Sequence, residues 1–305
     1  MNCCREMLET MRADWILERL DEETRIKEEY AREAQMISKF LAILFFTGYI
    51  LFTIAFMFGS KILDVIIPLN ESRPNILILQ AEYFVDEQKY FYSIVTISTI
   101  VEGLALVSAM SLQLIIWVFF HHLFGMFGVI GYGLENALPY EQRRSKEGCI
   151  HNDNIYYESI IIYVERYKSA IKFFKTLQNY MQFPFAVGLL FSTVILIPTL
   201  LSLTDTKHLE CKTLMQSGVL LGYIFINTYF GQKLIDLSSE IDQKIYFSDW
   251  RYCSLSIQKL LPFMIRQSDR PCMISIQKFY VLSIDCFRMV ITTAFSWFTV
   301  FRNIT

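Results

Sequence analysis

The sequence predicts an all-α, polytopic membrane protein with five transmembrane helices. The 305-residue chain is 53% hydrophobic and 15% aromatic, with a positive mean hydropathy, which is more apolar than an ordinary soluble domain. Five apolar runs with almost no charge alternate with polar segments, and most are long enough to cross a bilayer as helices. Residues 5–39 contain no apolar signal-peptide core, so the internal runs are expected to direct membrane insertion.

The chain begins with a polar segment, residues 1–39, which we expect to be helical and cytoplasmic. Acidic and basic side chains alternate there at helical spacing between Glu22 and Glu33. This pattern is typical of a solvated helix face, and an interaction surface is the alternative. The expected spans follow at residues 40–58, 91–120, 183–203, 214–230 and 279–301.

The positively charged side chains predict which segments face the cytoplasm. Residues 1–39, 121–182 and 231–278 hold seven Lys and Arg each, whereas 59–90 and 204–213 hold three and two. The first group is therefore expected inside, and the second outside with the tail 302–305. The sequons at Asn70 and Asn303 both fall on the outer side. The inner segments carry apolar helical faces, which predict a compact helical anchor region below the membrane.

No motif in the sequence supports catalysis, a metal or a cofactor. The seven cysteines lack metal-ligand spacing, and His121 and His122 are adjacent and so point in different directions on a helix. We interpret the two histidines as interfacial. The glycines at 125, 128, 131 and 133 follow a span rather than a strand, which favours a cytoplasmic bend or close helix packing over a phosphate loop. The net charge of −2 gives no indication of nucleic-acid binding.

The last expected span, residues 279–301, has a narrow polar side. On a helical wheel its polar residues fall within an arc of about 80°, and only Thr293 lies outside it; they are Asp285, Arg288, Thr292, Ser296, Thr299 and Asn303. Asp285 and Arg288 are three residues apart, so they could neutralise each other or line a water path. A spanning helix of this kind has one side toward lipid or protein and one toward water or a polar partner.

Two features of the earlier spans are candidates for ligand contact. Glu102 is the only charge of the second span, so it either contacts a ligand or ion or is a buried structural acceptor. Aromatic side chains are dense in the outer halves of the first two spans. They fit ordinary packing or an apolar cavity for a small lipophilic ligand.

Residues 233–301 resemble the C-terminal half of insect odorant receptors. The resemblance is carried by the sequence YFSDW at 246–250, by KLLPFMIR at 259–266, by Arg270-Pro271 and by the closing SWFTV at 296–300. Asp14-Trp15 and the acidic helix after it resemble that family's cytoplasmic stretch before its third span. The Thr-Tyr…Gln-Phe ending that is usual in gustatory receptors is not found.

The resemblance implies a seven-span subunit with a cytoplasmic N-terminus and an extracellular C-terminus, in the plasma membrane of sensory-neuron dendrites. It implies assembly with a co-receptor into a heterotetrameric, ligand-gated, non-selective cation channel in smell perception. The last helix would line the pore and narrow it at Val300, with Asp285, Thr292, Ser296, Thr299 and Asn303 along its polar side. Membrane lipid and small hydrophobic odorants are the other partners that it implies.

The resemblance also places an odorant pocket among four of the family's spans, three of which this chain contains. The residues expected to line that pocket here are Phe45, Gly48, Phe52, Glu102 and Tyr223. The register of the match implies that the family's first two spans are missing, which preserves the topology and removes one wall of the pocket. A small-solute transporter, a gustatory-type receptor and a purely structural subunit are the alternative functions.

Overall fold

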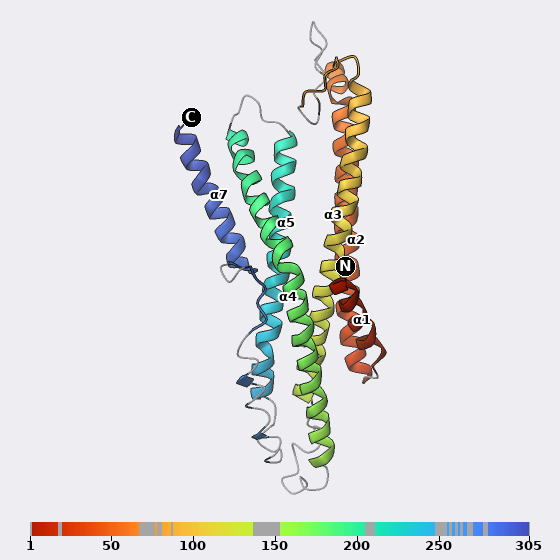
Figure 1. The fold of residues 1–305 in the computed structure, drawn as a ribbon, viewed down its shortest axis with the longest axis vertical. Helices are drawn as coiled ribbons and strands as arrows, with labels where there is room; N and C mark the ends of the chain where they lie inside the picture. The colour runs from red at the N-terminus through yellow and green to blue at the C-terminus, as the bar shows by residue number, and fades with distance from the viewer. Residues whose placement is uncertain are drawn as a thin grey trace. The chain divides into compact units, whose positions relative to one another are not determined.

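The computed structural model of the chain is almost entirely helical (Figure 1). It describes residues 2–17, 20–66, 77, 81–86, 88–136, 153–204, 211–247, 271–276 and 280–304, with isolated positions between 255 and 266. The helices are α1 (Asn2–Ile16), α2 (Asp21–Ile66), α3 (Phe91–Asn136), α4 (Asp153–Thr204), α5 (Cys211–Phe247) and α7 (Ile284–Ile304). An antiparallel pair of two-residue strands, β1 (Ser275–Ile276) and β2 (Tyr280–Val281), precedes α7. The predicted all-α class is confirmed.

The expected spans are parts of much longer helices. The polar segment before the first span continues into it without a break, within the 46 residues of α2. In the same way α4 joins the amphipathic stretch before residue 183 to the third span, and α5 carries the fourth span on to Phe247. Pro184 and Pro198 lie inside α4. The polar segments beside these spans are therefore helical extensions of them, as the apolar faces predicted.

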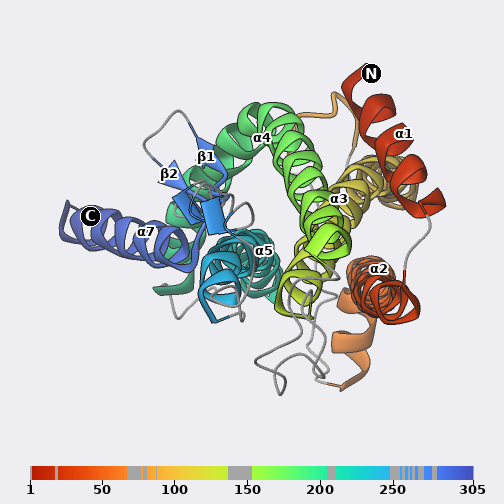
Figure 2. The same ribbon diagram turned by 90° about the horizontal axis from the view of Figure 1, so that it is seen from below.

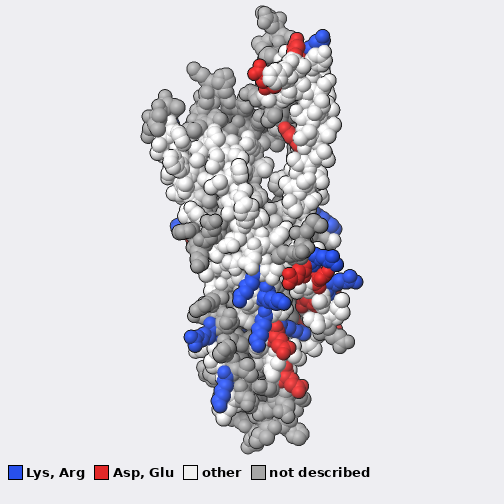
Figure 3. All heavy atoms as spheres, viewed as in Figure 1, with Lys and Arg blue, Asp and Glu red and all other residues white. Residues whose placement is uncertain are grey.

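Four helical stretches of the described chain are long and apolar enough to cross a membrane, which makes this a multi-pass membrane protein. They are Asp21–Gly59, Phe91–Asn136, Glu158–Leu200 and Ile284–Arg302. The remaining expected span, 214–230, lies in α5, where Gln216, Asn227 and Thr228 lower the mean hydropathy. On the face drawn in Figure 3, charged side chains gather over the N-terminal half of α4, and the surface of its C-terminal half is almost free of charge.

The chain divides into two compact units. Unit 1 comprises residues 1–30 and 119–305, and unit 2 comprises residues 31–118. In unit 1, α4 packs against α1, α5, α7 and β1, and α5 also packs against α7, as the view in Figure 2 shows. In unit 2, the hydroxyl of Tyr49 donates a hydrogen bond of 2.5 Å to the carbonyl of Thr99, which joins α2 to α3. Each unit is described by itself below.

An aromatic core fills unit 1 where α3, α4 and α5 meet. Phe119 and Phe120 of α3 are fully buried, and their rings lie 6.1 Å from that of Phe173 and 5.9 Å from that of Phe230. His121 and His122 are 2% and 7% exposed within this core, so both side chains face the protein interior. Both imidazole rings pack edge-on against phenylalanines, which lets them share the apolar interior.

The glycines of α3 permit close helix packing rather than a bend. The helix runs through all four of them to Asn136. A Cβ atom at Gly133 would lie only 2.0 Å from the ring of Tyr163, and one at Gly128 would lie 2.8 Å from the ring of Tyr30. Side chains of neighbouring helices therefore occupy the space that the missing Cβ atoms leave.

The final helix begins at Ile284 and not at residue 279. Residues 275–276, which were expected to be part of a helical segment, form β1. Tyr280 and Val281 instead form β2, which pairs Ile276 with Tyr280. Ser283 caps the helix, because its hydroxyl accepts a hydrogen bond of 3.4 Å from the amide of Cys286. A serine followed by Asp285 in the first turn is a recognisable start signal, so the sequence contained this boundary.

Candidate functional site

The two faces of α7 have different environments. Cys286, Val290 and Ala294 are at most 7% exposed, and the first two pack with Ile224 of α5 in one apolar cluster. On the other side Asp285, Arg288, Thr292, Ser296 and Thr299 are all exposed. The helix therefore packs on α4 and α5 through the side that holds Cys286, Val290 and Ala294. Its polar side is exposed, and so are apolar residues such as Phe295 and Trp297.

The polar groups on this side of α7 have hydrogen-bond or ion-pair partners within the helix itself. The hydroxyls of Thr292 and Ser296 each donate a 2.8 Å hydrogen bond to the carbonyl four residues earlier, and Thr299 donates one to Ser296. Asp285 and Arg288 form an exposed ion pair with 3.5 Å between the charged atoms. Such a surface can face water without an unpaired charge. Val300, beside it, is 47% exposed, and the side chain of Asn303 lies outside the described residues.

The start of α7 is fastened to both neighbouring helices. Gln178 and Gln182 of α4 donate hydrogen bonds of 3.0 and 3.2 Å to the hydroxyl and carbonyl of Ser275 in β1. On the α5 side, a Cβ atom at Gly231 would lie 2.1 Å from the carbonyl oxygen of Leu282. Glycine is therefore required where the backbone that leads into α7 crosses α5. This attachment fixes the position of the start of α7 relative to α4 and α5.

Four of the five residues expected to line an odorant pocket lie in unit 2. Phe52 packs on a buried cluster of Leu77, Phe91, Ile94 and Val95, so it contributes to packing there. Phe45 and Glu102 are partly exposed, and nothing lies within 4 Å of a Cβ atom built on Gly48. Tyr223 belongs to α5 in unit 1, where it packs against the cluster of Ile224, Cys286 and Val290.

Beside Glu102, the next residue allows a close contact between α2 and α3. A Cβ atom at Gly103 would lie 3.5 Å from the hydroxyl of Tyr49, which is the side chain bonded to Thr99. A Cβ atom at that distance would make an ordinary van der Waals contact, so the Tyr49 ring packs against this position without requiring glycine.

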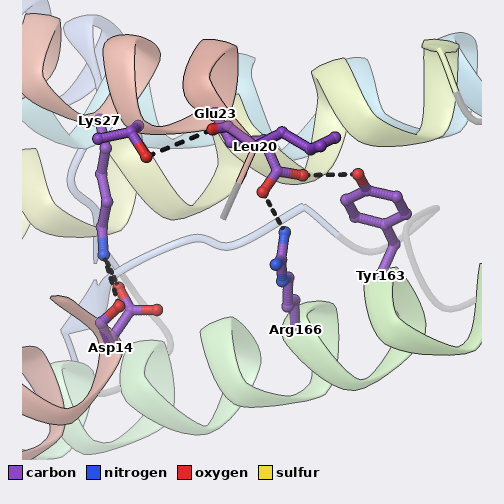
Figure 4. A network of polar contacts seen from close by, with 7 residues as sticks. Asp14, Leu20, Glu23, Lys27, Tyr163 and Arg166 are labelled. Carbon is purple, nitrogen blue, oxygen red and sulfur yellow. Dashed lines mark hydrogen bonds and ion pairs between the residues drawn. The ribbon is translucent and has the colours of Figure 1, made fainter. Parts of the chain in front are cut away.

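A buried polar network in unit 1 was missed by the sequence reasoning (Figure 4). Glu23 of α2 is 1% exposed, and its two carboxylate oxygens accept hydrogen bonds of 2.5 Å from Tyr163 and 2.8 Å from Arg166 of α4. The charged run that contains Glu23 was interpreted as a solvated face. That interpretation holds for most of the run, such as Glu22 and Arg25, and is wrong for Glu23 and Lys27.

Lys27 extends the network by one helical turn. Its ammonium group is paired with Asp14 of α1 and lies 4.6 Å from the centre of the Trp15 ring. His122 lies 3.5 Å from the same Asp14 carboxylate. A four-residue spacing places Glu23 and Lys27 on one side of the helix. This spacing was the available signal, but the partners lie up to 143 residues away in the sequence.

Cys272, just before β1, is a buried thiol. It is 3% exposed, and its amide donates a hydrogen bond of 2.9 Å to the hydroxyl of Ser238 in α5. Burial raises the pKa of the Cys272 thiol to about 12, because the apolar surroundings disfavour the thiolate. Such a thiol is a structural residue rather than a nucleophile. Within the described ranges, no group of three His, Cys, Asp or Glu side chains could hold a metal ion.

The fold and this site define a class: an all-helical, multi-pass membrane protein whose last helix presents a polar side. The chain belongs to the odorant receptor family, since the family model described as 7tm Odorant receptor matches residues 4–295. This is a family of receptors and not of enzymes.

Individual relatives match shorter segments. Three proteins of Drosophila melanogaster are similar to parts of the chain: putative odorant receptor 92a (29% identical over 80 residues), odorant receptor 49a (30% over 79) and odorant receptor 85f (28% over 112). These matches cover 26%, 26% and 32% of the chain, and 20%, 20% and 29% of the respective relatives.

Solved structures share the fold. The insect olfactory receptor OR5 from Machilis hrabei, solved in complex with eugenol, aligns with a TM-score of 0.73 and 13% identity over 98% of this chain and 75% of that one. A second structure of OR5 aligns with a TM-score of 0.66 and 12% identity, and covers 99% of this chain and 75% of that one.

Proposed function

We propose that this chain is an odorant receptor subunit that binds small volatile or lipophilic ligands and forms, with a co-receptor, a ligand-gated non-selective cation channel. The observation that carries the proposal is the two-sided character of α7. One apolar side, at Cys286, Val290 and Ala294, is buried on α4 and α5, while the polar side and apolar residues such as Trp297 are exposed. A polar helix side that the chain itself leaves uncovered suits a water-filled path between subunits.

In this mechanism, equivalent helices of four subunits surround the ion path. The hydroxyls of Thr292, Ser296 and Thr299 face the path, and Val300 narrows it with an apolar side chain. An apolar constriction can close a pore by excluding water. Ligand opens the channel only if it binds the open arrangement more tightly than the closed one. The attachment of β1 to Gln178 and Gln182 gives α4 a direct connection to the start of the pore helix.

In unit 2 the ligand is proposed to contact Phe45, Gly48, Phe52 and Glu102. Tyr223 is proposed as a ligand-contacting residue of unit 1. The open space beside Gly48 and the partial exposure of Phe45 and Glu102 support this assignment. OR5, whose fold this chain shares, was solved with eugenol, a small lipophilic molecule of the proposed ligand class. The N-terminus is proposed to be cytoplasmic and the C-terminus extracellular, in the plasma membrane of sensory-neuron dendrites.

The test is electrical recording from cells that express this chain together with an odorant receptor co-receptor. We expect cation currents evoked by members of an odorant panel that includes eugenol, which cells with the co-receptor alone do not give. Val300→Ala should increase the permeability of large organic cations, because it widens the constriction. Phe301→Ala, on the side of the same helix opposite the polar arc, is the matched control and should leave ion selectivity unchanged. Substrate flux without any co-receptor would contradict the proposal.

A further inference from the structure

Three lysines form one exposed face of α4. Lys168, Lys172 and Lys175 fall within an arc of about 60° on the helical wheel, and all three are exposed. Within the described part of the chain, none of their ammonium groups has an ion-pair partner. By contrast, Arg166 of the same helix pairs with Glu23 at 2.8 Å. The three residues, which we call the lysine face, therefore carry positive charge that no described carboxylate neutralises.

The charges of α4 are ordered along the helix. Glu158 and Glu165 are exposed and lie on the N-terminal side of the lysine face. In Figure 3, basic side chains gather over the middle of the helix, and acidic ones lie beyond them toward its N-terminal end. After Lys175, no Asp, Glu, Lys or Arg follows before the helix ends at Thr204. The lysine face is therefore the charged surface of α4 that lies nearest to its apolar half.

The length of this apolar half gives the depth of each lysine. Residues 183–203 extend about 31 Å as a helix, which matches the roughly 30 Å hydrocarbon core of a bilayer. Phe183, which is 77% exposed, then marks the edge of the hydrocarbon. Along the helix, Lys175 lies about 12 Å beyond this edge, Lys172 about 16 Å and Lys168 about 22 Å. The headgroup layer is roughly 5–8 Å thick on each side, so the long side chain of Lys175 reaches it.

Charge and depth together select the partner of the lysine face. Anionic phospholipid headgroups carry the opposite charge in the layer that Lys175 reaches, and they attract lysines close to the membrane surface. The attraction falls off within a Debye length of about 8–10 Å, so it weakens from Lys175 through Lys172 to Lys168. An acidic segment of a soluble protein is not confined to this layer and would not favour Lys175.

We propose that the lysine face binds anionic phospholipid headgroups of the membrane. The headgroups lie against Lys175 and Lys172 and supply negative charge where α4 leaves the bilayer. The contact sets the depth of α4 close to Gln178 and Gln182, which hold β1. The inference rests on the proposed function only for the choice of leaflet. The proposed topology assigns this end of α4 to the cytoplasmic side, where anionic lipids are concentrated.

The test identifies the lipid beside the lysine face. In the full chain, a benzophenone amino acid replaces Asn179, which is exposed one turn closer to the membrane than Lys175. The protein is placed in nanodiscs of phosphatidylcholine with a minor share of phosphatidylglycerol, and lipid adducts are identified by mass spectrometry after irradiation. We expect the ratio of phosphatidylglycerol to phosphatidylcholine adducts to exceed the bilayer ratio by about fivefold. Both leaflets have the same composition, so the result depends on neither the topology nor any current.

Variants assign the enrichment to individual lysines. Lys175→Gln should lower it most, Lys172→Gln less and Lys168→Gln least. Lys175→Arg keeps the charge and should preserve the enrichment. Lys244→Gln is the matched control, because Lys244 lies on α5 and pairs with Glu240 at 3.9 Å. Thermal unfolding verifies that each variant is folded.

Four results would overturn the proposal. The first is an adduct ratio equal to that of the bilayer, or an enrichment that survives the combined Lys172→Gln and Lys175→Gln substitutions. The second is an enrichment unchanged in high salt, which should screen a contact between exposed charges. The third is an equal loss for all three lysines, which would indicate an anionic partner outside the headgroup layer. The fourth is adducts at position 179 with a second copy of the chain, which would show that a subunit covers this face.

Discussion

Glu23 and Tyr163 are 140 residues apart in the sequence, and their side chains share a buried hydrogen bond of 2.5 Å. The same carboxylate pairs with Arg166, so one acidic side chain connects the start of α2 to the N-terminal half of α4. A buried charge is tolerated because it has two partners. This connection belongs to the part of unit 1 that carries the charged surface, away from the apolar half of α4.

Removing this carboxylate should destabilise the protein. Glu23→Ala leaves Arg166 without its counter-ion and Tyr163 without its acceptor, so we expect a loss of about 3 kcal/mol, the scale for breaking a buried pair. The measurement is thermal unfolding of the chain in nanodiscs. Glu22→Ala is the matched control, since Glu22 is exposed and should cost well under 1 kcal/mol. Equal melting temperatures for the two variants would contradict the buried network.

Gly133→Ala should destabilise unit 1 by overpacking. The added methyl would lie 2.0 Å from the Tyr163 ring, and a clash of this size in a packed core costs about 1–3 kcal/mol. Gly218→Ala is the control, because no atom lies within 4 Å of its Cβ position and alanine favours the helix by up to about 1 kcal/mol. Thermal unfolding should therefore move in opposite directions for the two variants. A shift of both in the same direction would count against the packing described here.

Cysteines placed on α7 should distinguish a water-facing side from a packed one. In cells that co-express the co-receptor, Ser296→Cys and Thr299→Cys should react with a membrane-impermeant cationic thiol reagent and lose odorant-evoked current. Phe301→Cys, exposed on the side of the helix opposite the polar arc, should keep its current, because a thiol there does not face the proposed ion path. Ala294→Cys, at 0% exposure, should also keep it. Equal block at all four positions would exclude a one-sided pore helix.

Gly231→Ala should disturb the start of α7. A methyl group 2.1 Å from the Leu282 carbonyl must displace that backbone, since no flexible side chain can yield there. We expect smaller odorant-evoked currents at unchanged surface expression, as measured by recording and surface labelling. Gly222→Ala, on the same helix with open space around it, is the control. Normal currents in both variants would show that the crossing at Gly231 does not position α7.

The thiol of Cys272 should resist alkylation while the protein is folded. With a pKa of about 12, its thiolate fraction near pH 7 is only about one part in 10⁵. Because the folded pKa lies above the ordinary thiol value of 9.0, the associated stability is present below pH 9 and is lost between pH 9 and 12. The check is mass-spectrometric alkylation with iodoacetamide from pH 7 to pH 9. Reaction of Cys272 as fast as partly exposed Cys4 would contradict its burial.

The sequence predicted the helical spans and the polar side of α7. Hydrocarbon offers backbone groups no hydrogen-bond partners, so an apolar run of sufficient length must satisfy them locally as a helix. The arrangement of Asp285, Thr292, Ser296 and Thr299 follows from helical periodicity alone. The cap at Ser283 was also contained in the sequence, although a purely hydropathic boundary at residue 279 overlooked it.

The tertiary structure decided which polar residues are buried and where α7 is fastened. Glu23 and Glu22 are neighbours of the same type, and only the approach of α4 places one against Arg166 and leaves the other in solvent. In the same way, the glycine at 231 acquires its role from the backbone at Leu282. Periodicity defines the sides of each helix, whereas the side that each helix presents to its neighbour depends on contacts between residues distant in sequence.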